Sequence, residues 1–135
     1  MGFYVQKYGG SSLKSPDHIK KVALRISELR KEGHKMIVVV SAMGETTDDL
    51  INLAYQVSDH PSRRELDMLL STCERISMAL LSMALHDLQC SAISFTGSQA
   101  GVLTCDSHSN ARIMNIIPKR IEAEIYRNVV VLAGF

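Results

Sequence analysis

The sequence predicts an α/β fold, in which a mostly parallel sheet is sandwiched by helices in three layers (α/β/α). Segments typical of strands alternate with segments typical of helices along the chain. The runs 36–40 and 129–135 consist mainly of Val, Ile and Leu, as in parallel strands that are buried on both faces. Ligands bind at the carboxyl ends of the strands in open α/β sheets. Here four such ends carry Gly, Ser or Thr: 9–10, 41–44, 96–97 and Gly134.

The first third of the chain is predicted to form a strand, a helix and a second strand. Residues 3–8 alternate loosely in hydrophobicity and stop at a Gly-Gly pair, which favours a strand. Ser15 suits the N-cap of a helix and Pro16 suits its first position. Apolar residues then recur at helical spacing up to 32–33, where a glycine is expected to end the helix. The β-branched run 36–40 follows as the second strand.

The central part of the chain is predicted to be helical. Thr46 or Thr47 can cap a helix that begins there. Residues 63–88 are apolar at helical spacing. Ser71 or Thr72 could cap a new helix within this stretch, so the sequence leaves open whether a junction divides it.

The last third is predicted to contain two more strands and a short helix. Residues 92–95 form a short apolar strand that ends in a turn rich in Gly, Ser and Thr. A short helix is expected over 118–127 and a buried strand over 129–135. Because the chain stops at the end of this apolar strand, we expect residues 1–135 to form the N-terminal part of a larger domain, whose fold is incomplete here.

The bulk composition argues against several classes of protein. A chain of 135 residues is one domain at most, and 46% hydrophobic with 21% charged residues is usual for soluble globular proteins. A net charge of +1 and an aromatic content of 5% give no support for nucleic acid or a membrane as partner. The uninterrupted apolar runs are far shorter than a membrane span. The three cysteines lack metal-ligand spacing and indicate free thiols in a reducing cytoplasm.

The segment 5–12, in which a strand runs into two glycines and two serines, is the clearest candidate for a phosphate site. Gly9 and Gly10 allow backbone N–H groups to surround an anion, and the hydroxyl group of Ser11 adds a donor. Lys7 can supply the fixed positive charge that a polyphosphate needs. By itself the pattern also fits an ordinary loop with a surface lysine beside it.

Five segments together resemble the aspartate kinases, within the amino acid kinase family. Residues 7–12 (KYGGSS) resemble that family's K-[FY]-G-G-[ST]-S opening, and residues 38–48 resemble its V-V-S-A-M-x-x-x-T-[DN] strand and turn. Residues 69–77 resemble its S-x-G-E-x-x-S segment. The other two are 94–113, which opens with SFTGSQAG, and 130–135, which is similar to the strand before a Q-G turn. Five matches in the right order, over essentially the whole chain, are highly specific.

The resemblance implies an enzyme that transfers the γ-phosphate of ATP to the side-chain carboxylate of L-aspartate, the first step of lysine, threonine and methionine biosynthesis. Lys7 would contact the transferring phosphates and be the catalytic residue, while Gly9, Gly10 and Ser11 would cradle them. Ser41 would lie on the nucleotide-phosphate side. Mg²⁺ would be held mainly by the ATP phosphates, and no side chain is predicted as a metal ligand.

The same resemblance assigns residues to the acceptor. Thr47 would help to hold aspartate, and Glu74 would pair with its α-ammonium group. Because the reacting carboxylate is ionised at neutral pH, no general base is required, and catalysis consists of positioning and charge neutralisation. From the residue types alone, Thr47 could equally be a turn or cap residue and Glu74 an exposed helical charge. L-aspartate would be the small-molecule partner of a cytoplasmic homo-oligomer.

The chain departs from the family pattern in two ways. Cys73 stands where the pattern has glycine, which could weaken aspartate binding, shift specificity or have no effect. The second half of the kinase domain, with its G-R-G-G-S-D-like stretch, and the regulatory domains are missing, so residues 1–135 are expected to be inactive alone. Two alternatives remain open: another amino-acid kinase, or a degenerate non-catalytic module that binds nucleotide or provides an association surface.

Overall fold

The computed structural model describes residues 2–104 and 113–134, and part of the fourth resembling segment and Phe135 lie outside them. The elements alternate as the sequence predicted. In chain order they are β1 (Phe3–Tyr8), a 3-10 turn η1 (Gly10–Leu13), α1 (Pro16–Lys31), β2 (Lys35–Val40), α2 (Thr46–Val57), α3 (Arg63–Asp87), β3 (Ala92–Phe95), β4 (Val102–Thr104), β5 (Ile113–Ile116), α4 (Lys119–Glu124) and β6 (Val129–Ala133).

Four strands form one parallel sheet in the order β1-β2-β6-β3. Val5 lies opposite Ile37, Ile37 lies opposite Val130, and Ile93 lies opposite Val130 on the far side, so one row of apolar residues crosses the whole sheet. Strand β6 comes last in the described chain yet lies in the interior of the sheet. Its residues 129–131 are fully buried, which confirms the prediction of a parallel strand covered on both faces.

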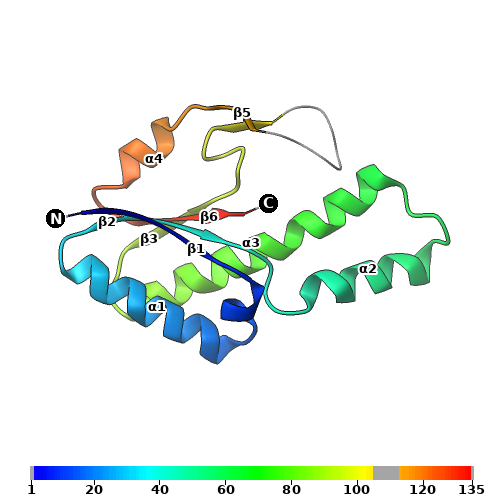
Figure 1. Ribbon diagram of the computed structural model, residues 1–135, viewed down its shortest axis with the longest axis horizontal. Helices are drawn as coiled ribbons and strands as arrows, with labels where there is room; N and C mark the ends of the chain where they lie inside the picture. Colours follow the sequence, from blue (N-terminus) through cyan, green and yellow to red (C-terminus); the bar gives the residue numbers. More distant parts are fainter. Residues whose placement is uncertain (1, 105–112, 135) are drawn as a thin grey trace.

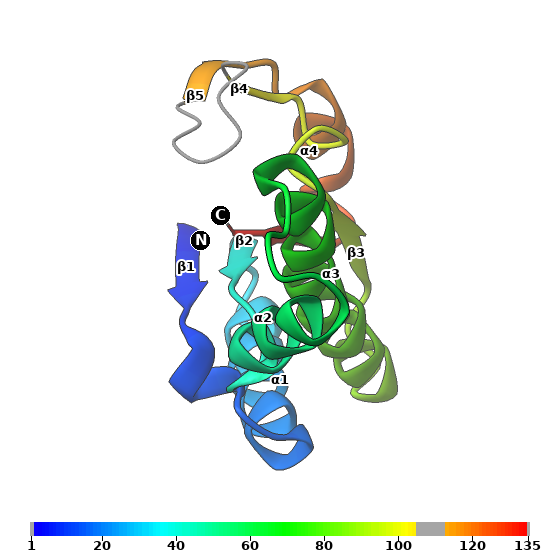
Figure 2. The ribbon, with the colours of Figure 1, turned by 90° about the vertical axis from the view of Figure 1, so that its right-hand side faces the viewer.

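Helices cover both faces of the sheet, but one outer layer is incomplete. Helices α1 and α3 lie on one face, where Val38 and Val131 pack with Leu81. Helix α4 and the strands β4 and β5 lie on the other face, over β6 and β3 (Figures 1 and 2). Phe3 and Val5 of β1 remain 57% and 62% exposed. The three-layer arrangement is therefore present, with an apolar part of β1 uncovered.

The helix α1 begins as predicted, whereas α2 does not. The Ser15 side chain accepts a hydrogen bond from the His18 N–H at the start of α1. Helix α2 has Glu45 at its N-cap and no side-chain cap. The hydroxyl group of Thr46 instead donates to the carbonyl group of Met43 in the preceding turn. The prediction that Thr46 or Thr47 caps α2 is therefore wrong.

Helix α3 is one continuous helix of 25 residues without an internal junction. The hydroxyl groups of Ser71 and Thr72 donate to the carbonyl groups of Met68 and Leu69, each at 2.7 Å. These bonds run back one turn within the helix, where a cap would receive a bond from an N–H group further along. By length and composition α3 could also span a membrane. However, its buried residues pack on the sheet, which is typical of a core helix.

The antiparallel pair β4–β5 was not predicted from the sequence. Its closure depends on Gly101, which has φ +86° and accepts a hydrogen bond from the Ile117 N–H at 2.8 Å. Positive φ is a conformation that glycine adopts without a steric penalty. The strands have only three and four residues, which is too short for an alternating hydrophobic pattern to identify them in the sequence.

Candidate functional site

Turns from neighbouring strands meet at the carboxyl edge of the sheet. The Ser41 N–H after β2 donates to the carbonyl group of Tyr8 at the end of β1, at 3.2 Å. The Gly44 N–H donates to the carbonyl group of Gly10 at 3.3 Å. After β6, the Gly134 N–H donates to the carbonyl group of Val40, the last residue of β2, at 2.7 Å. Backbone hydrogen bonds therefore join three of the four turns that the sequence predicted at this edge, those after β1, β2 and β6.

The two glycines after β1 are needed for different reasons. A Cβ atom on Gly10 would lie 3.3 Å from the carbonyl oxygen of Ala42, so a side chain there would press on the turn after β2. A Cβ atom on Gly9 would meet nothing within 4 Å. Gly10 thus lets the two turns approach, whereas Gly9 leaves open space beside the backbone. Open space next to exposed backbone is what a phosphate group would need in order to approach it.

Lys7 is exposed and lies two residues before Gly9. Strand alternation places its side chain on the same face as Phe3 and Val5, which is the incompletely covered face. Glu74 lies on α3, which covers the opposite face. Within the described residues, no ion pair joins Lys7 to Glu74. A ligand that touches both must therefore wrap around the carboxyl edge of the sheet.

Glu74 is half-buried, and its burial raises the pKa of its carboxyl group above the ordinary value of 4.5. A hydrogen bond with the backbone lowers this pKa by a smaller amount. No ion pair neutralises Glu74 within the described part of the chain. Thr47 is half-buried in the first turn of α2, directly after the turn 41–44. A half-buried carboxylate without a cation suits a positively charged ligand group.

We expect Glu74→Gln to make the protein more stable at neutral pH. Since the pKa of Glu74 is higher in the folded than in the unfolded state, the folded state binds more protons, and stability falls as pH rises through the window above 4.5. The variant should lose this part of the pH dependence, as thermal unfolding between pH 4.5 and 8 would show. Glu122→Gln, at an exposed position in α4, is the matched control and should leave the pH profile unchanged.

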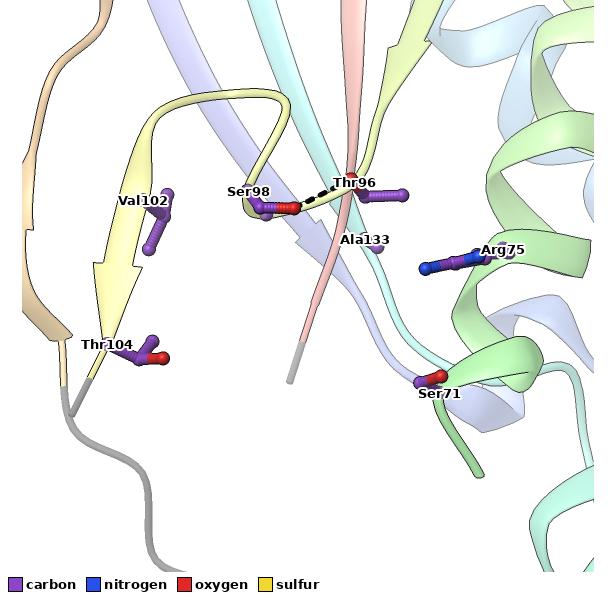
Figure 3. A pocket seen from close by; sticks show the side chains of 8 residues that line it. Ser71, Arg75, Thr96, Ser98, Val102, Thr104 and Ala133 are labelled. Atoms are coloured by element: carbon purple, nitrogen blue, oxygen red, sulfur yellow. Dashed lines mark hydrogen bonds between the residues drawn. The ribbon is translucent and has the colours of Figure 1, made fainter. Parts of the chain in front are cut away.

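A cavity of about 160 Å³ lies further along the same edge, between α3 and the turn that follows β3 (Figure 3). Its lining residues are Ser71, Arg75, Thr96, Gly97, Ser98, Val102, Thr104 and Ala133. None of the residues predicted as site residues lines it. The sequence analysis placed the turn 96–97 at this edge but did not identify Arg75. The available signal was its position one helical turn after Ser71, on the same face of a helix whose first half lies near the rim.

The chain is similar to proteins of one known family. The amino acid kinase family model matches residues 2–135. The chain is 53% identical, over all of its length, to the aspartokinase of Geobacillus stearothermophilus, and 53% identical to that of Mycolicibacterium smegmatis. It covers 33% and 32% of those two proteins. The chain thus spans about a third of the length of the curated relatives that it matches.

The fold is also similar to solved structures of aspartate kinases. The aspartate kinase of Synechocystis superposes with a TM-score of 0.78 at 45% identity, over 97% of this chain and 21% of that one. Aspartokinase III of E. coli, in a complex with aspartate and ADP, superposes with a TM-score of 0.80 over 97% of this chain and 40% of that one. At 18% identity the second likeness shows the fold alone. Because the family model matches nearly all of its residues, this chain belongs to the amino acid kinase family.

Proposed function

We propose that residues 1–135 form the N-terminal portion of the kinase domain of an aspartate kinase. The enzyme would transfer a phosphoryl group from ATP to L-aspartate and form 4-phospho-L-aspartate. This reaction would be the first step of lysine, threonine and methionine biosynthesis. The observation that carries the proposal is an identity of about 50% to aspartokinases over the whole chain, all of the rim turns included. The remainder of the kinase domain and any regulatory domains would cover the apolar face that Phe3 and Val5 leave exposed.

The phosphates of ATP would lie at the end of β1. Lys7 would place its ammonium group against the transferring phosphoryl group, and its exposure leaves it free to do so. The open side of Gly9 would admit the phosphate chain to the backbone. Gly10 and the hydroxyl group of Ser11 would complete the cradle, and Ser41 would bound it from β2. Bound ATP supplies a γ-phosphoryl group that is open to in-line attack by an oxygen nucleophile.

The acceptor would be held by the helices on the other face of the sheet. Glu74 would pair with the α-ammonium group of aspartate, which is the cation that its half-buried carboxylate lacks. Thr47 would donate its hydroxyl hydrogen to the substrate. One side-chain carboxylate oxygen then forms the new bond to phosphorus, the bond to the β-phosphate oxygen breaks, and ADP leaves. No general base is needed because the carboxylate is already ionised.

We infer from the resemblance that Mg²⁺ would enter with ATP, bound mainly to phosphate oxygens and water. Lys7 and Mg²⁺ would together offset the charge on the transferring group. We also propose that the native protein is a cytoplasmic homo-oligomer that binds neither nucleic acid nor a membrane.

The experiment is an aspartyl hydroxamate assay on the native protein with MgATP. We expect product with L-aspartate and much less with glutamate or carbamate, whereas the 135-residue polypeptide alone should be inactive. Product only with another acceptor would make the protein a different amino-acid kinase. A native protein that MgATP stabilises against heat, but that phosphorylates no acceptor, would be the non-catalytic module.

A further inference from the structure

We propose that Cys73 is a positioning residue, whose side chain keeps α2 and α3 apart and thereby sets the distance between Thr47 and Glu74. These two residues are proposed above to hold the acceptor, so the inference rests on the proposed function and adds a residue that tunes the same site. The side chain of Cys73 is almost completely buried. It therefore acts through the packing of the two helices and not by contact with the substrate.

The burial of Cys73 depends on its position along α3. Cys73 and Leu80 are seven residues apart, about two helical turns, so they lie on the same face of the helix. Cys73 is 1% exposed, whereas Leu80 is 37% exposed. Helix α2 packs against α3 and lies beside its first half, which contains Cys73 but not Leu80 (Figure 1). The cover that Cys73 has and Leu80 lacks is therefore α2.

The face of α2 that meets α3 can be identified from a similar pattern. The half-buried residues of α2 recur at a spacing of three or four residues, which places them on one side of the helix. They include Thr47, Leu50, Ile51 and Ala54. Asp49, Asn52 and Gln56, on the opposite side, are exposed. Thr47 therefore lies on the side of α2 that faces α3.

Thr47 and Cys73 lie at the same level of this pair of helices. The two helices run in roughly opposite directions and are joined by residues 58–62 (Figure 1). Thr47 comes ten residues before the last residue of α2, and Cys73 comes ten residues after the first residue of α3. At a rise of about 1.5 Å per residue, both lie about 15 Å from the connection. Because Glu74 is the next residue in α3, Cys73 separates the helices at the level where both acceptor residues lie.

The size of the residue at position 73 should decide how closely the two helices approach. Interaxial distances between packed helices range over about 8–10 Å and depend on the side chains at the contact. A glycine, which the family pattern has at this position, would let α2 move closer to α3 by about 1 Å. Cys73 belongs to neither of the two apolar clusters that form the core, so the core does not depend on its size. A displacement of about 1 Å in a residue that positions the substrate can lower the rate by about 100-fold.

The test is a series of substitutions at position 73 of the native protein, measured in the aspartyl hydroxamate assay. Cys73→Gly should raise the KM of L-aspartate by about fivefold or more, because Thr47 moves towards Glu74 and the acceptor no longer fits between them. The KM of ATP should not change, since Lys7 lies on β1. Cys73→Ser has nearly the same size and should retain the native KM. Cys73→Ala should give an intermediate KM, and it decides the question if Cys73→Gly does not fold.

Ser82→Gly is the matched control, because Ser82 is buried in the second half of α3, beyond α2. It introduces the same residue into the same helix, and should lower the melting temperature while both KM values stay unchanged. An unchanged KM of L-aspartate in a folded Cys73→Gly variant would overturn the inference and leave the proposed function standing. An equal rise in Ser82→Gly would also contradict it, because the effect would then come from a weakened helix.

A second measurement does not depend on activity. Crystal structures of the native and Cys73→Gly proteins should show the axes of α2 and α3 closer by about 1 Å in the variant, at the level of residue 73. An unchanged interaxial distance would show that Cys73 does not space the helices. If the native protein forms no aspartyl phosphate, the proposed function fails, and this distance still decides whether the inference about Cys73 holds.

Discussion

Replacing Lys7 with methionine is expected to lower kcat for aspartyl phosphate formation by about 10²- to 10³-fold, which is the usual effect of removing one preorganised group that stabilises transition-state charge. Lys7 is exposed at the end of β1 and has no ion pair within the described chain. The fold therefore does not depend on its ammonium group. Methionine keeps most of the length of the side chain and removes only the charge. The measurement is kcat in the hydroxamate assay, with the melting temperature recorded alongside.

Lys20→Met, at an exposed position in α1, is the control for the loss of one surface charge and should retain full activity. Both variants should melt within a few degrees of the unaltered protein, because surface substitutions usually change stability by less than about 0.5 kcal/mol. If Lys7→Met turned over at the normal rate, the phosphate cradle at the end of β1 would be in the wrong place. The kinase site would then have to be sought elsewhere on the rim.

Replacing Gly101 with alanine is expected to destabilise the protein by about 3 kcal/mol or more, since overpacking and a forced positive φ each cost on the order of 1–3 kcal/mol. The new Cβ atom would lie 1.9 Å from the carbonyl oxygen of Ile117. This oxygen belongs to the backbone, so it cannot move aside as a flexible side chain would. Gly101 also has φ +86°. Thermal unfolding should show a clear decrease in melting temperature.

Hydrogen exchange can show which part of the structure Gly101→Ala destabilises. The Ile117 N–H donates to the Gly101 carbonyl group, and its protection should be lost in Gly101→Ala while the amides of β6 stay protected. Gly9→Ala is the matched control, because its Cβ atom would meet nothing within 4 Å and its φ is −81°. This control should be as stable as the unaltered protein but less active, since the methyl group occupies the open side of the cradle. Equal stability of Gly101→Ala would show that β4–β5 does not close as described.

The sequence predicted the elements that have strong periodic patterns or strong terminal signals. The apolar runs of β2 and β6 are long enough to identify buried strands, and the Ser15-Pro16 pair fixed the start of α1. Ambiguous hydroxyl residues were less informative. Ser71 and Thr72 can cap a helix or bond back one turn within it, and only the surrounding packing selects between these two states. The strands β4 and β5 have only three and four residues, so they leave no periodic pattern to detect.

Some residues of the candidate site could likewise be identified from the sequence, whereas others could be identified only from the structure. The glycines and serines after β1 and β2 are local signals, because the turn that follows a strand lies next to it in the chain. Arg75 and the turn after β3 are about 20 residues apart in sequence, and no local pattern connects them. They meet because α3 packs along the sheet and its first half lies beside the carboxyl edge, from which the helix runs towards the amino edge where β3 begins (Figure 1).

The sequence by itself determined the α/β class, the parallel sheet, the rim of small residues and the resemblance to the amino acid kinases, because these depend on composition and spacing within short segments. The tertiary structure decided the continuity of α3, the pairing of β4 with β5 and the separation of Lys7 and Glu74 onto opposite faces of the sheet. Each of these depends on contacts between segments far apart in the chain. Burial and packing energies, rather than local propensity, select among such arrangements.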